Sequence, residues 1–166
     1  ITACGPNARN CWNTEGSYKC SCKNGFTGWN SLSGCNDIDE CKLGSHNCTG
    51  SLPVCVNSIG SYTCVAPVKL TGGATSREGT VYVWNQLNQR YEGVCDDSWD
   101  IQDATVACRW LGFGGGSPTT NSFFGSESNY IMDDMMCTGS ESSLFSCPYN
   151  PKHNCGPGET AGVKCS

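Results

Sequence analysis

The chain of 166 residues is rich in cysteine and glycine and poor in charge. It contains 15 cysteines and 21 glycines, and only 15% of its residues are charged. These proportions indicate a loop-rich chain held together by disulfides, and hence an oxidising, extracellular compartment. The formal net charge of −5 arises entirely after residue 67, and Lys and Arg form no cluster, so nucleic acid is a poor direct partner.

No run of the chain approaches the roughly 18 apolar residues that a membrane-spanning helix needs. No secretory leader with a charged start and an apolar centre is present either. Because the chain begins at Ile1 without an initiator methionine, we expect a mature piece or a fragment of a secreted or surface protein, possessing no transmembrane segment of its own.

Residues 1–36 contain the segment CWNTEGSYKCSCKNGFTGWNSLSGC. It resembles the later part of an EGF-like module whose first cysteine is missing, and the resemblance implies the disulfides Cys4–Cys20 and Cys22–Cys35. Cys11 is then left unpaired, and the odd total of 15 cysteines agrees. Either its partner lies upstream, or Cys11 forms an intermolecular disulfide, or the piece is a repeat cut from a longer assembly.

Residues 37–67 begin with DIDEC and continue with CVNSIGSYTC. This stretch resembles the calcium-binding kind of EGF-like module, which implies the disulfides Cys41–Cys55 and Cys48–Cys64. The last two cysteines of such a module are absent, so the module is truncated and VAPV leads directly into the next domain.

The same resemblance implies a calcium site in this module. The ligands would be the side chains of Asp37, Glu40 and Asn57 with the main-chain carbonyls of Ile38 and Ser58. Ca²⁺ prefers six to eight hard oxygens, and these residues supply that kind of atom. The alternative interpretation is a solvated acidic linker. The first module lacks an acidic cluster, and we expect no ion there.

Residues 68–166 form the third predicted domain. Val81 and Val83 alternate with aromatic residues, as in a half-buried strand, and residues 85–89 indicate a hairpin tip. A short amphipathic helix is predicted from its N-cap Asp100, with Asp103 in the capping-box position and Gly112 as the stop. The apolar positions expected along this helix are Ile101, Val106, Ala107, Trp110 and Leu111.

This domain carries the blocks CDDSWD, CRWLGF, CTGSESSLFSC and AGVKCS in order. It resembles the scavenger receptor cysteine-rich (SRCR) domain of the six-cysteine group. That resemblance implies the disulfides Cys95–Cys155, Cys108–Cys165 and Cys137–Cys147. The expected fold is therefore small and disulfide-rich: two EGF-like β-hairpin modules, followed by an α+β domain with a curved antiparallel sheet and one short helix.

The resemblance to metal-binding SRCR domains implies two cation sites in this domain. The first would be held by Asp96, Asp97 and Glu159, and the second by Asp133, Asp134 and Asn154. The alternative interpretation is that these side chains cap turns or pair with Arg109. Thr160 stands where an acid is common, which favours a weaker first site.

The predicted function is non-enzymatic, calcium-dependent recognition or adhesion, in which the SRCR domain binds anionic polysaccharide, glycan or protein ligands. The alternative is a structural subunit of an extracellular matrix or filament that self-associates as a homo-oligomer. A third hypothesis is that the modules target an enzyme located elsewhere in a longer chain. Asn47 heads the only glycosylation sequon, and whether it carries a glycan stays open.

Overall fold

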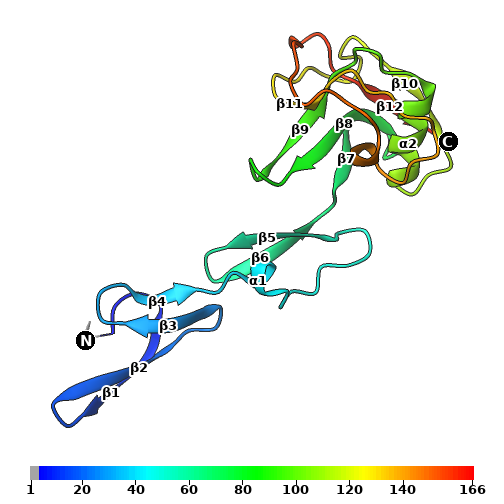
Figure 1. The fold of residues 1–166 in the computed structure, drawn as a ribbon. Helices are drawn as coiled ribbons and strands as arrows, with labels where there is room; N and C mark the ends of the chain where they lie inside the picture. The colour runs from blue at the N-terminus through cyan, green and yellow to red at the C-terminus, as the bar shows by residue number, and fades with distance from the viewer. Residues whose placement is uncertain (1–3) are drawn as a thin grey trace. The chain divides into compact units, whose positions relative to one another are not determined.

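The computed structural model describes residues 4–166, which divide between two compact units, Ile1–Val65 and Ala66–Ser166 (Figure 1). We call them the N-terminal and C-terminal units. The first is built of β-hairpins and one helical turn, whereas the second contains a larger sheet and the longest helix.

The N-terminal unit contains three separate two-stranded antiparallel sheets. Each joins neighbouring strands of the chain, as expected for EGF-like hairpins. The strands are β1 (Ala8–Thr14), β2 (Ser17–Cys22), β3 (Phe26–Asn30), β4 (Gly34–Asp37), β5 (Val54–Ser58) and β6 (Ser61–Val65).

A single helical turn, α1 (Glu40–Leu43), lies between the second and third hairpins. It begins because the side chain of Asp39 accepts a hydrogen bond from the Lys42 N–H at 3.0 Å. It ends at Gly44, whose φ of 66° lies in the left-handed region that glycine adopts without strain. The turn buries none of its residues, so local capping rather than packing accounts for it.

Disulfides replace an apolar core in the N-terminal unit. The only buried hydrophobic residues among its described positions are the cysteines Cys4, Cys35, Cys48 and Cys55. Across both units, the sulfurs are joined in the pairs Cys4–Cys20, Cys22–Cys35, Cys41–Cys55, Cys48–Cys64, Cys95–Cys155, Cys108–Cys165 and Cys137–Cys147.

Cys11 lies beside the first of these bridges. Its sulfur contacts that of Cys4 and is 3.7 Å from that of Cys20. A sulfur atom takes part in one disulfide, so Cys11 and Cys20 compete for Cys4. Three sulfurs therefore share one bridge, and Cys11 is the exposed member of the group.

The C-terminal unit is organised around a six-stranded sheet. Its central path runs β10-β12-β8-β9-β11, and β7 also pairs with β8. All pairs are antiparallel except β9 and β11, which run parallel, so the sheet is mixed. The strands are β7 (Val68–Gly72), β8 (Glu78–Asn85), β9 (Arg90–Val94), β10 (Gly116–Thr119), β11 (Tyr130–Met132) and β12 (Gly162–Cys165).

The predicted alternation along β8 is confirmed. Val81 and Val83 are completely buried, whereas Tyr82 and Trp84 are half-buried on the other face. The hairpin tip is one residue shorter than expected, because Asn85 still pairs with Arg90.

The predicted helix is present as α2 (Ile101–Trp110). The Asp100 side chain accepts hydrogen bonds from the N–H groups of Gln102 and Asp103. In return, the Asp103 side chain accepts a hydrogen bond from the Asp100 N–H at 2.9 Å, which completes a capping box. The expected apolar face was wrong at Ile101, which is 56% exposed. The first turn instead buries Asp103, whose carboxylate also accepts a hydrogen bond from the Cys137 N–H at 2.9 Å.

One hydrophobic core joins this helix to the sheet. It includes residues of β8, β9, α2, β11 and β12, together with Leu144 of the short 3₁₀ helix η1 (Leu144–Ser146). The core cysteine Cys108 ties α2 to Cys165 of β12. The C-terminal unit therefore has apolar packing that residues 4–65 lack.

Candidate functional site

The three side chains expected to hold calcium in the N-terminal unit come from successive elements. Asp37 ends β4, Glu40 begins α1 and Asn57 lies in β5. Asp37 accepts hydrogen bonds from the Gly60 N–H at 2.5 Å and the Asn57 side-chain amide at 2.9 Å. These two bonds, that from Gly60 first, lower the pKa of the Asp37 carboxyl. A charged carboxylate is thus held ready at neutral pH.

Two oxygens of this set have no partner. Glu40 Oε2 and Asn57 Oδ1 are shielded from solvent and accept no hydrogen bond. A buried acceptor without a donor costs free energy, and such atoms are rare in folded proteins. A hard cation such as Ca²⁺ would satisfy both oxygens. The carbonyls of Ile38 and Ser58 belong to residues directly following Asp37 and Asn57, so the residues present fit a calcium ion.

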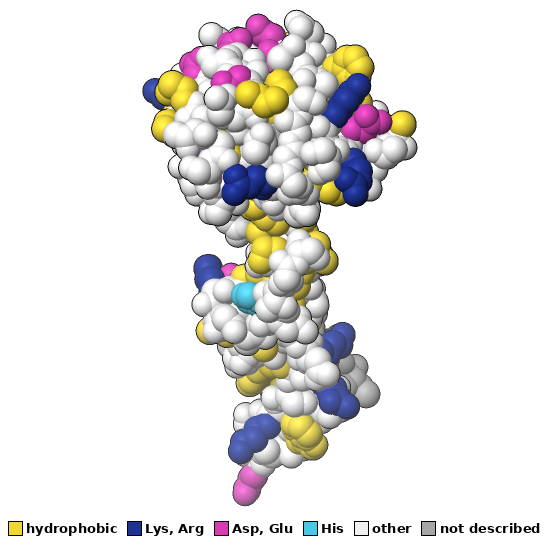
Figure 2. Space-filling model, turned by 90° about the vertical axis from the view of Figure 1, so that its right-hand side faces the viewer, with side chains coloured by type: hydrophobic (Ala, Val, Ile, Leu, Met, Phe, Trp, Pro, Cys, Tyr) yellow, Lys and Arg dark blue, Asp and Glu magenta, His cyan; other side chains and the backbone are white. Residues whose placement is uncertain are grey.

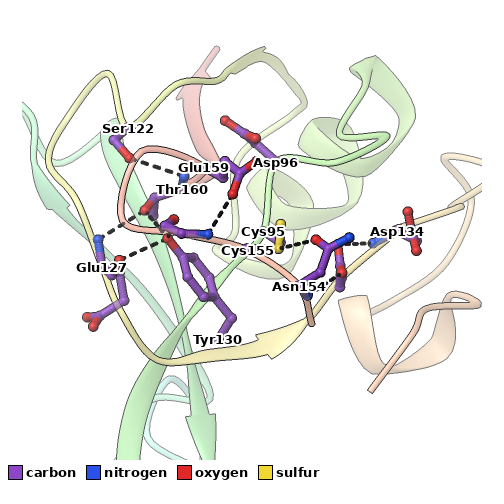
Figure 3. The surroundings of a disulfide bond; sticks show 12 residues. Cys95, Asp96, Ser122, Glu127, Tyr130, Asp134, Asn154, Cys155, Glu159 and Thr160 are labelled. Carbon is purple, nitrogen blue, oxygen red and sulfur yellow. Dashed lines mark hydrogen bonds between the residues drawn. A yellow bond between two sulfur atoms is a disulfide. The ribbon is translucent and has the colours of Figure 1, made fainter. Parts of the chain in front are cut away.

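The candidate ligands of the C-terminal unit surround the disulfide between Cys95 and Cys155. In Figure 3, Asp96 and Glu159 lie on one side of this bridge, and Asp134 and Asn154 lie on the other. The Asp96 N–H donates to the Glu159 carbonyl at 2.9 Å, which keeps the two loops side by side.

The remaining two candidates, Asp97 and Asp133, connect these groups. A carboxylate oxygen of each lies within 4.8 Å of the other and of both bridge sulfurs. The parallel pairing of β9 and β11 explains this closeness: both strands end at the same edge, and Asp97 and Asp133 follow those ends. Side chains assigned to two separate sites thus belong to one continuous cluster, which we call the Cys95 acidic cluster (Asp96, Asp97, Asp133, Asp134, Asn154 and Glu159).

Asp133 is the most buried acid of this cluster, with 1% of its surface exposed. Its carboxylate accepts hydrogen bonds from the backbone N–H groups of Asp134 at 2.7 Å and Asn154 at 3.4 Å. The ion pairs found within residues 4–166 are Lys42–Asp39 and Arg90–Glu92, so no cationic side chain compensates the cluster. Arg109, the expected alternative partner, donates to the Gly139 carbonyl at 2.5 Å.

Repulsion between the carboxylates of the Cys95 acidic cluster opposes the presence of a negative charge on every one of them. Burial and then the neighbouring carboxylates of Asp133, Glu159, Asp134 and Asp96 raise the pKa of Asp97. Carboxylates crowded in this way repel one another unless a cation intervenes. Figure 2 shows several Asp and Glu side chains near one another at the top of the C-terminal unit. The donor set therefore fits a hard divalent cation.

Two carboxylates of the cluster also cap turns. One oxygen of Asp96 accepts from the Asn121 N–H, and Glu159 Oε2 accepts from the Gly156 N–H at 2.5 Å. Within residues 4–166 the second oxygen of each forms no hydrogen bond. Turn capping and cation binding are therefore compatible, because each carboxylate has an oxygen to spare.

A network of hydrogen bonds supports the cluster, and it was not predicted from the sequence. The buried Tyr130 hydroxyl lies 2.7 Å from the Gly156 carbonyl and 2.8 Å from Thr160 Oγ1 (Figure 3). Ser122 Oγ donates to the Pro157 carbonyl at 2.7 Å and accepts from the Thr160 N–H at 3.2 Å. Thr160 thus positions the Glu159 loop. Its partners are distant in sequence, and no local pattern identifies them.

Comparison with protein-family models matches both parts of the chain. The model of the scavenger receptor cysteine-rich domain matches residues 71–166, and that of the calcium-binding EGF domain matches residues 2–35 and 37–76. The chain belongs to the scavenger receptor cysteine-rich family, and its SRCR domain follows calcium-binding EGF domains. These are non-catalytic, disulfide-bonded extracellular modules.

Curated relatives match about 60% of the chain. A scavenger receptor cysteine-rich domain superfamily protein of Patiria pectinifera is 41% identical over 103 residues, covering 60% of this chain and 9% of the relative. The macrophage receptor MARCO of Mesocricetus auratus is 39% identical over 100 residues, covering 59% of this chain and 20% of the relative. The chain thus spans a small part of these relatives.

Solved structures show the same fold for the C-terminal unit. The third SRCR domain of murine neurotrypsin matches with a TM-score of 0.55 at 36% identity, covering 60% of this chain and 94% of that domain. The SRCR domain of mouse MARCO, crystallised in a dimeric form, matches with a TM-score of 0.50 at 39% identity and the same two coverages. Within residues 4–166, no helix is long and apolar enough to cross a membrane.

Proposed function

We propose that the chain is an extracellular recognition module whose SRCR domain binds anionic ligands through cations held in the Cys95 acidic cluster. The observation that carries this proposal is that carboxylate oxygens of Asp97 and the almost fully buried Asp133 lie within 4.8 Å of each other and form no ion pair. A buried, uncompensated carboxylate is costly, and a bound divalent cation removes that cost.

A cation in this cluster also changes what the acidic surface attracts. Asp96 and Glu159 each have one carboxylate oxygen that forms no hydrogen bond and can bind an ion. An ion bound by these oxygens keeps coordination positions open on its other side. A ligand carboxylate, sulfate or phosphate completes the coordination shell, because Ca²⁺ takes six to eight oxygens. Extracellular modules bind calcium with dissociation constants of about 10⁻⁴ to 10⁻³ M, so millimolar calcium would occupy the cluster.

The calcium site of the N-terminal unit has a structural role in this proposal. The ion would be held by Asp37, Glu40 and Asn57, and it would order the turn α1 against the β5–β6 hairpin. Support comes from the two solvent-shielded oxygens of Glu40 and Asn57 that lack hydrogen bonds. This ion would stabilise the module without touching the ligand.

The test is binding of the protein to sulfated, carboxylated and neutral polysaccharides in calcium and then in EDTA. Asp97→Asn and Asp133→Asn keep the side-chain shape and remove one charge each, and Glu15→Gln makes the same change on an exposed residue of the N-terminal unit. We expect calcium-dependent binding that both cluster variants lose and Glu15→Gln keeps. Binding that ignores EDTA and both substitutions would show that the proposal is wrong.

A second candidate function is self-association, favoured by one observation. Cys11 is exposed and shares a single bridge with Cys4 and Cys20, so one sulfur of the three is left for another partner. In a structural subunit, that sulfur would join two copies of the chain. Non-reducing electrophoresis tests this: multimers that collapse on reduction support it, whereas a monomer that persists without reductant contradicts it.

A further inference from the structure

Residues 120–125, which we call the Phe123 loop, present an aromatic pair beside the Cys95 acidic cluster, and one ring of the pair is exposed. Phe123 is 63% exposed, and its ring meets that of the half-buried Phe124 edge-on at a centroid distance of 4.8 Å. A single exposed aromatic ring is ordinary on a protein surface, so any role of Phe123 depends on the groups that surround it.

The Phe123 loop is tethered on both sides of the aromatic pair. Ahead of it, the Asn121 N–H donates to Asp96, and the Ser122 N–H donates to the Thr160 carbonyl at 3.2 Å. After it, the Gly125 carbonyl accepts from Thr80 Oγ1 at 3.2 Å. The loop thus connects an aromatic side chain directly to a candidate cation ligand.

The backbone of the loop holds an uncommon conformation. Asn121 and Ser122 have φ values of 55° and 52°, in the left-handed region that costs non-glycine residues on the order of 1 kcal/mol or more each. A Cβ on Gly162 of β12 would lie 2.5 Å from Thr119 Oγ1 and 3.0 Å from both the Gly79 carbonyl oxygen and Phe124 Cδ2, so the Phe124 ring is one of three groups that pack closely over this glycine. Phe124 anchors the loop, and Phe123 is held outward.

The ammonium group of Lys164 lies over the exposed ring. Lys164 Nζ is 4.9 Å from the Phe123 ring centroid and 5.9 Å from that of Phe124. Lys164 is exposed and forms no ion pair within residues 4–166. The surface therefore offers an ammonium group, an aromatic ring and, through Asn121, the carboxylate of Asp96.

We propose that Phe123 is a specificity-determining residue that stacks on the apolar face of a pyranose ring in an acidic polysaccharide. Lys164 pairs with a sulfate or carboxylate of the same sugar chain, while another acidic group reaches the cation of the Cys95 acidic cluster. The aromatic ring and the ammonium group together match a sugar with an acidic substituent, whereas a polyanion without rings has nothing to stack. This inference rests on the proposed function and narrows its ligand class.

The test measures dissociation constants in calcium for three probes: a sulfated glycosaminoglycan octasaccharide, polyacrylate and poly(dT). We expect Phe123→Ala to weaken octasaccharide binding about fivefold to tenfold, the size of an aromatic contact, and to leave polyacrylate binding within about twofold. Phe145→Ala is the matched control, because Phe145 is 45% exposed and contacts Trp110 instead. Phe123→Leu keeps an apolar side chain in the loop and should lose the same selectivity.

The outcomes separate this inference from the proposed function. If the unaltered protein binds neither the octasaccharide nor polyacrylate in calcium, the proposed function itself fails. If binding needs calcium but both Phe123 variants keep full affinity for the octasaccharide, the stacking role is wrong and the cation-dependent function stands. An equal loss for polyacrylate, or a larger loss for poly(dT), would likewise overturn the assignment of a sugar ligand.

Discussion

The two units of this molecule achieve order in different ways. The N-terminal unit buries no hydrophobic residue other than cysteine among its described positions, whereas the C-terminal unit encloses a core of valine, alanine, methionine and leucine. Small modules cannot bury enough apolar area to fold unaided, and disulfides or metals supply the difference. The same cation would therefore matter for folding in the first unit and for recognition in the second.

Removing a disulfide should give the largest difference between the units. We expect the pair Cys48→Ser and Cys64→Ser to unfold residues 37–65, because a native bridge typically contributes about 2–5 kcal/mol and no other core is present. The matched pair Cys137→Ser and Cys147→Ser should leave the C-terminal unit folded. Hydrogen exchange measured by mass spectrometry resolves the two regions. Equal protection of the two units from hydrogen exchange in both variants would contradict the proposed difference between them.

A cavity in the core should affect the C-terminal unit alone. Leu144→Ala removes a completely buried side chain and should lower the free energy of unfolding by about 2–5 kcal/mol. The control Leu87→Ala changes a side chain that is 93% exposed and should have an effect below about 0.5 kcal/mol. Denaturant titration followed by tryptophan fluorescence measures both. A small effect of Leu144→Ala would show that the core is not the main source of stability.

Calcium removal should have a moderate destabilising effect on the N-terminal unit. At a calcium concentration ten times the dissociation constant, a single site adds about 1.4 kcal/mol of stability, which EDTA abolishes. Asn57→Ala should eliminate this response of the N-terminal unit, whereas Asn13→Ala, at the matching position of the first module, should keep it. Hydrogen exchange measured by mass spectrometry with and without EDTA resolves the two units. A response of residues 37–65 that persists in Asn57→Ala would show that the ion is held by other residues.

The smallest expected effect is a pH dependence within the C-terminal unit. Burial alone would raise the pKa of Glu92, but hydrogen bonds from Asn85, Asn88 and Arg90 outweigh it and lower the pKa. A carboxyl whose pKa is lowered on folding stabilises the protein above its ordinary value of 4.5, and this contribution is lost as the pH falls through the folded-state pKa. Melting temperatures of Glu92→Gln and the unaltered protein should therefore converge below pH 4.5. A constant difference across that range would show that Glu92 does not titrate as inferred.

Several features followed from local sequence patterns. Residues close together in the chain form the capping box of Asp100 and Asp103 and the alternation around Val81 and Val83. Short motifs of the same kind identified the family of the last hundred residues. Ile101 broke its pattern because the first turn of α2 directs Asp103 inward, where the Cys137 N–H needs an acceptor. The spacing of apolar residues predicts which face of a helix is buried. It does not show that a backbone N–H in a distant loop requires a hydrogen-bond acceptor.

The sequence by itself determined the class of module, the disulfide-rich composition and the types of oxygen-bearing residue that would meet a cation. Only the tertiary structure decided that Asp97 and Asp133 lie together, because the parallel pairing of β9 and β11 unites two strand ends far apart in the chain. It also decided that Phe123 is exposed while Phe124 packs near Gly162. Both outcomes depend on long-range contacts, which a linear pattern of residues does not encode locally.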